Sequence, residues 1–253
     1  MSRFGWGRVD REGLRAAILE GDAVLPLIHA DASVAAQLVS RAAIDPEARG
    51  RFSVLDDAGL GITDAPRWFV PAPERGPFLA VLLNAPDEGV ECVLGLVEHA
   101  TERWAEAAAQ ASDEMHPFTS SAPQDPFEVV IEGEPVPLVG DADVMHWCRG
   151  GGRISSVLTS SMMALESYLY RRLDGDADIT PVLERLTQSR SLAVWGLLVE
   201  VARYRPSLLR GPLLPLVSGA AILLADKLFT LHGNIIMPVG LDRTFGERIR
   251  QWN

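Results

Sequence analysis

Ser191-Leu-Ala-Val-Trp-Gly-Leu-Leu-Val-Glu-Val201 is the stretch of sequence that decides the fold. A helix at the surface of a protein has one apolar face and one polar face, whereas a helix that is apolar all round is covered by other elements. This stretch is hydrophobic at almost every position. It therefore predicts a helix sandwiched between neighbours on both sides, as in an α-solenoid.

The segments that flank this stretch have the periodicity and the breaks of short helices. Over 155–173, apolar residues recur on one helical face at Leu158, Met162, Leu165 and Leu169. Short apolar segments also cover 180–189, 207–217 and 219–231, and small or polar residues separate them. This layout predicts a mainly α fold of stacked antiparallel helix pairs, an α-solenoid of the HEAT type, although the sequence has no sharp fixed-period repeat.

Further upstream, the sequence predicts a long amphipathic helix over 86–110. Pro86 suits a first helical position, and the acids Asp87 and Glu88 favour the positive end of a helix dipole. One face of this helix is apolar, and the opposite face is acidic. The acidic face carries Glu91, Glu98, Glu102 and Glu106.

The N-terminal part of the chain differs in composition from the rest. Between 10 and 44 a helical apolar rhythm is repeatedly broken, which predicts two or three short helices. From 45 to 77 the chain is rich in Gly, Pro and Asp, which predicts a loop or linker that Trp68 and Phe69 anchor. We therefore expect 1–76 to form an N-terminal unit of helices and linker.

A small β-hairpin is predicted inside the helical region. Phe127–Ile131 and Pro135–Val139 flank Glu132-Gly-Glu134, a pattern that suits a small hairpin. The prolines restrict the second strand to an edge. The sequence thus predicts a helical-repeat domain over 77–253, with the hairpin inserted near 127–139.

Composition narrows the classes of partner. The 253 residues carry a formal net charge of -11, whereas a duplex-binding protein ordinarily needs a basic excess to neutralise phosphates. We therefore expect no nucleic-acid partner. The one lysine, Lys227, does not lie in a Gly-x-x-x-x-Gly-Lys-Ser/Thr pattern, so this chain has no P-loop lysine.

Two further features favour the cytoplasm. The most apolar run, Leu213–Ala225, is interrupted by Pro215 and is shorter than the ~20 residues that span a bilayer. Cys92 and Cys148 form no Cys-x-x-Cys pair, so we expect both to remain thiols and expect neither zinc nor a disulfide. We predict a cytoplasmic protein with no membrane segment, metal or cofactor.

The strongest candidate for a small-ligand site is Arg149-Gly-Gly-Gly-Arg153. The helix expected from Ser155 would offer its N-terminal amides to an anion, alongside the Gly151 and Gly152 amides and the two guanidinium groups. The alternative is a flexible helix C-cap and turn, because the Gly-x-Gly-x-x-Gly spacing and a preceding strand are missing.

Other polar groups have structural explanations beside the chemical ones. Asp174, Asp176 and Asp178 are spaced like half of a calcium loop, but the second half departs from that pattern, so they are expected to cap helices. His146 and Cys148 are too close in sequence to share a helix face, which predicts a buried thiol and a surface histidine rather than a nucleophile pair.

Two acids lie in apolar helices and need partners. Glu166 and Glu200 could form a carboxylate pair for acid–base catalysis. The alternative is interhelical bridging to arginines, for which Arg171, Arg172 and Arg203 are the candidates. We favour bridging and expect no catalytic residues.

Four stretches carry a family resemblance: Met163–Arg172, Ile179–Leu186, Ser189–Pro206 and Gly211–Pro215. Their helical pattern resembles the region downstream of the nucleotidase module in very large bacterial STAND-type ATPases, several of which belong to anti-phage defence systems. Upstream, Pro77–Ala80, Pro86–Val90 and Val97–Trp104 look like an earlier part of the same region. The resemblance covers roughly 77–253. It implies a helical repeat that mediates protein contacts, while the family's ATPase motifs are absent from this chain. No functional residue carries over.

These observations lead to one main hypothesis about function and two others. The main hypothesis is a non-catalytic scaffold that is a segment of, or a partner to, a large STAND-type ATPase, with a protein or the rest of a longer polypeptide as its partner. Its contact surface is either the acidic face of 86–110 or the ends of the stacked helices. The second is an anion-binding regulatory domain at 149–155. The third is a hydrolase that uses Glu166, Glu200 or His146.

Overall fold

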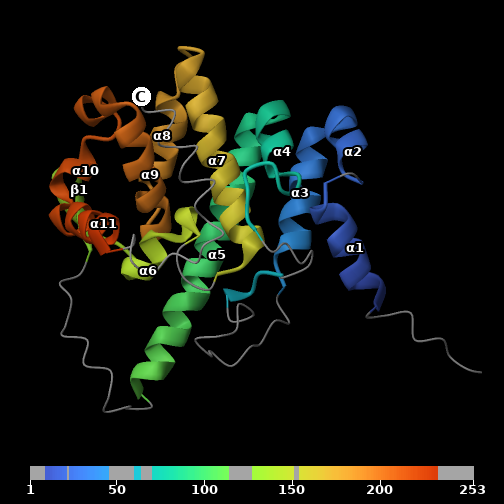
Figure 1. Ribbon diagram of the computed structural model, residues 1–253, viewed down its shortest axis with the longest axis horizontal. Coiled ribbons are helices and arrows are strands. Elements are labelled where there is room, and N and C mark those ends of the chain that lie inside the picture. Colours follow the sequence, from blue (N-terminus) through green and yellow to red (C-terminus); the bar gives the residue numbers. More distant parts are fainter. Residues whose placement is uncertain are drawn as a thin grey trace, which may run out of the picture.

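The chain folds into a mainly helical structure with one small sheet. The computed structural model describes residues 9–21, 23–45, 60–63, 70–113, 127–150 and 154–232. Within these ranges it contains eleven α-helices and a two-stranded antiparallel sheet (Figure 1). The mainly α class and the inserted hairpin are thus confirmed.

Three short helices form the N-terminal part, as the broken apolar rhythm predicts: α1 (Val9–Leu19), α2 (Leu25–Ala30) and α3 (Ala32–Ala43). The Asp31 carboxylate caps α3 by accepting a hydrogen bond from the Val34 amide at 3.0 Å. The described parts of the expected linker contain no α-helix, while Trp68 and Phe69 lie outside the described residues.

The long helix predicted over 86–110 is α5 (Pro86–Asp113), and it follows the short helix α4 (Phe78–Asn84). A Cβ atom added at Gly89 would lie 2.8 Å from the Leu82 Cα, so these two helices meet backbone to backbone. α5 also packs against α3, α7 and α9. It connects the N-terminal helices to the C-terminal ones.

The hairpin consists of β1 (Glu128–Ile131) and β2 (Glu134–Pro137), with Val129 opposite Val136. Glu132 and Gly133 turn the chain with φ values of 53° and 88°, the left-handed region that a tight two-residue hairpin turn requires. Beyond the hairpin, the Val139 carbonyl accepts a hydrogen bond from the Leu192 amide. The hairpin is thus tied to the start of the next apolar helix.

The remaining helices follow the predicted segments closely. They are α6 (Ala142–Met145), the 3₁₀ helix η2 (Trp147–Arg149), α7 (Ser156–Asp174), α8 (Thr180–Thr187), α9 (Leu192–Tyr204), the 3₁₀ helix η3 (Pro206–Arg210), α10 (Pro215–Ser218) and α11 (Ala220–His232). The single helix expected over 207–217 is wrong. Gly211, Pro212 and Pro215 divide it into η3 and α10, because proline lacks the amide that a continuing helix donates.

Helix α9 contains nearly all of the apolar stretch 191–201, and other elements pack around it. Every residue from 192 to 199 is buried, and α5, α6, α7, α8 and α11 all pack against the helix. A Cβ atom added at Gly196 would overlap the Met145 carbonyl oxygen, so glycine lets α6 approach the α9 backbone directly. The prediction of a fully covered helix is confirmed.

The buried hydrophobic residues form one continuous core that extends from Ile18 to Ile222. Helices on both sides of residue 76 contribute to it. No helix in the described ranges is long and apolar enough to cross a membrane.

Candidate functional site

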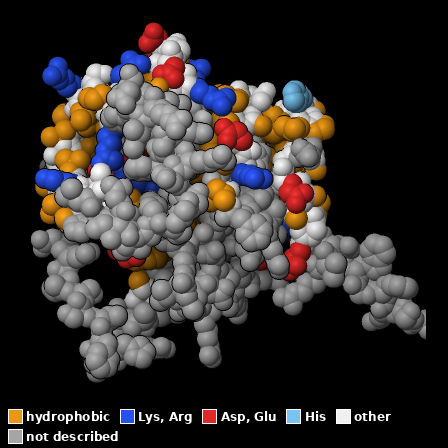
Figure 2. All heavy atoms as spheres, in the orientation of Figure 1, with side chains coloured by type: hydrophobic (Ala, Val, Ile, Leu, Met, Phe, Trp, Pro, Cys, Tyr) orange, Lys and Arg blue, Asp and Glu red, His pale blue; other side chains and the backbone are white. Residues whose placement is uncertain are grey.

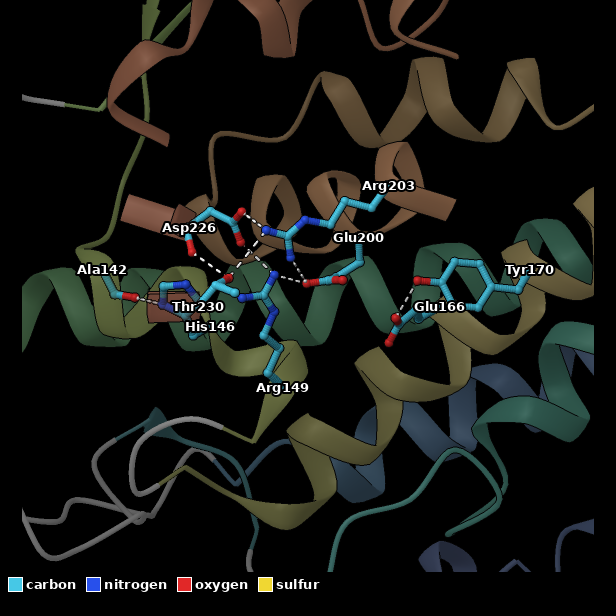
Figure 3. A network of polar contacts seen from close by, with 9 residues as sticks. All are labelled: Ala142, His146, Arg149, Glu166, Tyr170, Glu200, Arg203, Asp226 and Thr230. Carbon is cyan, nitrogen blue, oxygen red and sulfur yellow. Dashed lines mark hydrogen bonds and ion pairs between the residues drawn. The ribbon is translucent and has the colours of Figure 1, made fainter. Parts of the chain in front are cut away.

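A buried cluster of charges joins three helical elements at the C-terminal side of the molecule. Arg149, at the end of η2, forms ion pairs with Glu200 on α9 and with Asp226 on α11 (Figure 3). The Arg149 Nη2 lies 2.6 Å from Asp226 Oδ1. All three side chains are largely buried, with 8%, 13% and 6% of their surface exposed.

Arg203 completes the cluster from α9. Its Nη1 donates to Glu200 Oε1 at 3.2 Å, and its Nη2 pairs with Asp226. Two guanidinium groups therefore alternate with two carboxylates, which balances the charge inside the cluster. Removing one member of such a set leaves an uncompensated buried charge, which is far costlier than losing a surface ion pair.

Aromatic contacts also attach α11 to η2 and to His146, the residue that precedes η2. The Phe229 ring of α11 stacks on the His146 ring, with centroids 3.8 Å apart and planes 13° apart. The Arg149 guanidinium carbon lies 5.3 Å from the Phe229 centroid, a cation–π distance. Helix α11 is therefore docked through Asp226 and Phe229 together.

His146 is buried, not exposed, so the expectation of a surface histidine is wrong. Only 3% of it is accessible, because α11 brings Phe229 across its ring. Its Nδ1 donates to the Ala142 carbonyl, while its buried Nε2 has no hydrogen-bond partner in the part of the chain that the structure describes. Burial lowers the pKa of His146 to about 4, so the ring is neutral at physiological pH.

The opposite face of α11 is apolar and exposed. Ile222 and Asp226 point inward, whereas Leu223, Leu224 and Leu228 are 43%, 57% and 46% exposed. Neighbouring hydrophobic side chains extend this face: Leu214 and Val217 at α10, and Val130 on β1, are 59%, 56% and 42% exposed. We call these six residues the C-terminal apolar surface, and Figure 2 shows hydrophobic side chains at the end of the molecule where α10 and α11 lie.

The residues of the candidate anion site have other roles where they are described. The Arg149 guanidinium forms ion pairs with Glu200 and Asp226. The Ser155 hydroxyl accepts a hydrogen bond from the Val157 amide and caps α7. Gly150 ends η2 with a φ of 68°, as a helix C-cap does. Gly151, Gly152 and Arg153 lie outside the described residues.

The two acids in apolar helices lie in separate clusters (Figure 3). Bridging by arginine is confirmed for Glu200, whose partners include the expected Arg203 and the unexpected Arg149. Glu166 accepts a hydrogen bond from the Tyr170 hydroxyl at 2.7 Å, one turn along α7. The sequence did not point to this tyrosine as a partner.

The remaining candidate side chains also have structural contacts. Asp178 accepts the Thr180 amide at the start of α8, and Asp174 accepts the Tyr204 hydroxyl, so both aspartates act at helix ends. Cys92 and Cys148 are buried and form no disulfide, as expected. Burial raises the pKa of Cys92 to about 12, which keeps it a thiol.

The docking of α11 is not among the features that the sequence predicts, although one acid in this helix points to a buried contact. Asp226 is the single acid between Leu213 and His232, and a carboxylate in so apolar a run needs a buried partner. The partner could not be identified, because Arg149 lies 77 residues away.

Comparisons with known proteins add no relative: no protein-family model and no curated protein matches this chain.

Proposed function

We propose that this chain is a non-catalytic helical scaffold, an α-solenoid of stacked helix pairs, that works through protein contacts within or beside a large bacterial STAND-type ATPase. The observation that carries the proposal is the orientation of α11. This helix turns its carboxylate inward to Arg149 and Arg203 and turns its leucines outward.

This orientation departs from what a surface helix ordinarily favours, since three leucines are exposed and the one carboxylate is buried. An amphipathic helix ordinarily buries its apolar stripe and exposes its charges. Burying a leucine side chain contributes roughly 1.5–3 kcal/mol, so each exposed leucine forgoes part of that stabilisation. Contiguous exposed apolar residues mark interaction surfaces. A protein contact that covers Leu224 and Leu228 recovers the lost stabilisation.

The geometry of α11 also suits a contact surface. Leu224 and Leu228 are one helical turn apart, so they lie on the same side of the helix. The ion pairs and the His146–Phe229 stack fix the helix to η2 and α9. The leucines are therefore presented in a defined position, which lowers the entropic cost of binding.

The acidic face of α5 is less available for a partner. Glu91 pairs with Arg185 at 3.3 Å, Glu98 accepts the Ser189 hydroxyl and Glu106 pairs with Arg103. Three of its four carboxylates thus already have intramolecular contacts. Of the two surfaces that the sequence suggests, the end of the helix array is favoured.

Two further points support the wider proposal. Helix α9 is covered by α5, α6, α7, α8 and α11, which is compatible with stacked helix pairs. The resemblance of 77–253 to the helical region of STAND-type ATPases is the basis for proposing that the assembly contains such an ATPase.

Affinity capture from the native bacterium, with the full chain as bait, tests this proposal. The wild type is expected to retain a STAND-type ATPase, recognised by its own nucleotide-binding motif, and Leu224→Glu is expected to lose it. Leu83→Glu is the matched control, because Leu83 is 47% exposed on α4, far from α11 in the sequence. Equal recovery of the ATPase with both variants, or its absence from the wild-type sample, contradicts the proposal.

A further inference from the structure

The two halves of α11 are attached to the rest of the molecule by different kinds of contact. The first half is held by apolar packing, since Ile222 is fully buried in the core. The second half turns Asp226 inward to the charge cluster and lays Phe229 on the His146 ring. No hydrophobic residue over 226–230 is fully buried. The position of the second half therefore depends on the charges and on the aromatic stack.

The start of α11 is fixed by close packing at Gly219, the residue between α10 and α11. A Cβ atom added at Gly219 would lie 2.9 Å from the Ile222 Cδ1 and 3.2 Å from the Val129 Cγ1. This residue thus packs tightly between β1 and the first turn of α11. The second half of α11 is the part that can separate from η2 and α9 while the first half stays in place.

His146 lies against this second half, and one of its nitrogens lacks a partner. Its Nδ1 donates to the Ala142 carbonyl of α6, and its Nε2 is buried with no hydrogen-bond partner among the described residues (Figure 3). A second proton on the ring would occupy Nε2, where no acceptor of the described chain receives it. Separation of Phe229 uncovers the ring, and water then supplies that acceptor.

The charges around His146 also oppose its protonation while α11 is docked. The charged groups that face the ring are Arg149 of η2, Arg203 of α9 and Asp226 of α11, and Glu200 of α9 completes their cluster. Two guanidinium groups and two carboxylates already balance, so a protonated His146 would be an uncompensated third cation. Burial lowers the pKa of His146 to about 4, whereas an imidazole in water has an ordinary pKa of about 6.5.

We propose that His146 and α11 form a pH-sensitive switch, in which protonation of His146 and separation of the second half of α11 from η2 and α9 occur together. The helix is released as the pH falls. An isolated helix of 13 residues is marginal in water, so the released part also loses helical hydrogen bonds. Release removes the fixed position of Leu228, one of the leucines on which the proposed contact depends. The switch itself is a property of the isolated chain, so its test does not depend on the partner.

Amide hydrogen exchange of the purified full chain, measured by mass spectrometry at about pH 7.5 and about pH 5, tests this switch. Rates are divided by those of the unstructured chain at each pH, so that only the opening equilibrium is compared. With the two pKa values above, opening of α11 is expected to increase roughly 30-fold at the lower pH. Peptides from α7 are expected to keep their protection, because α7 packs against α4, α5 and α9. An unchanged α11, or an equal loss of protection in α7, overturns the inference.

Two glutamine variants identify the titrating group. Glutamine carries no charge at either pH, so His146→Gln is expected to remove the pH dependence of exchange in α11. His29→Gln is expected to retain it, since His29 is exposed on α2. A His146→Gln variant that still shows the wild-type increase would assign the release to other groups and refute the switch.

Phe229→Ala tests the aromatic cover and leaves His146 unchanged. This variant is expected to expose α11 to exchange already at about pH 7.5, and its His146 ring is expected to titrate near the ordinary pKa of about 6.5 in NMR spectra. In the wild type the same ring is expected to titrate near 4. Titration of His146 at the same pH in both proteins, or full protection of α11 in Phe229→Ala, contradicts the coupling of this ring to α11.

Discussion

The Arg149 guanidinium donates to the Asp226 carboxylate across 2.6 Å, although 77 residues of sequence separate the two. This contact joins η2 to α11, and both side chains are less than one-tenth exposed. It determines which face of α11 points inward, and therefore which face presents leucines to the surroundings. The ion pair and the exposed apolar face of α11 therefore depend on the same orientation of this helix.

Asp226→Ala is expected to destabilise the protein by about 3–5 kcal/mol, because it leaves Arg149 and Arg203 without one of their two carboxylate partners. Urea unfolding measures the change. The neighbouring Lys227→Ala is the control, since its exposed side chain is expected to contribute within about 0.5 kcal/mol. Similar free energies of unfolding for the two variants would show that the charge cluster does not hold α11.

Stability is expected to rise with pH between about 4 and 6.5 because of His146. Burial lowers the pKa of the folded-state imidazole to about 4, below its ordinary 6.5, so in this interval the unfolded chain binds more protons. The contribution is fully present above pH 6.5 and is lost as the pH falls toward 4. It amounts to about 3 kcal/mol at most.

His146→Gln removes this titration and is expected to flatten the pH profile of the unfolding free energy. His29→Gln is the matched control, because His29 is exposed on α2. The other titrating groups are common to both variants, so the difference between the two profiles isolates His146. Profiles of equal slope would contradict a buried, neutral His146.

Gly196→Ala is expected to destabilise the protein by about 1–3 kcal/mol, because the added methyl group overlaps the Met145 carbonyl oxygen in a packed core. Helix propensity alone predicts the opposite sign, by about 1 kcal/mol. Gly95→Ala on α5 is the control, since nothing lies within 4 Å of the position of its added Cβ, and a small gain in stability is expected. Thermal unfolding of both variants measures the difference, and a gain at both positions would exclude a close contact of α6 with α9.

Helix α5, the hairpin turn and the buried helix α9 could be predicted from the sequence, because each depends on residues close together in the chain. Pro86 with Asp87 and Glu88 marked the start of α5, and Glu132-Gly133 marked the hairpin turn. The apolar run from 191 to 201 indicated that α9 is covered on all sides. In each case the periodicity or turn chemistry of a short segment contains the information.

The α11 docking was not predictable, because it depends on contacts distant in sequence. The spacing of His146 and Cys148 predicts a surface histidine, whereas Phe229 of α11 stacks on the buried His146 ring. Asp226 indicated an internal partner but not which arginine. The outward direction of Leu224 and Leu228 follows from that same contact, so the candidate surface could not be located from the apolar pattern of α11.

Site-specific photo-crosslinking in the native cell tests the central claim most directly. A photoreactive amino acid is placed at position 224 in one strain and at position 83 in another, so that the two exposed leucines are compared at equal expression. We expect a discrete crosslinked product at position 224, containing the proposed ATPase partner, and none at position 83. No product at position 224, or the same products at both positions, would contradict the claim that protein covers the outward face of α11.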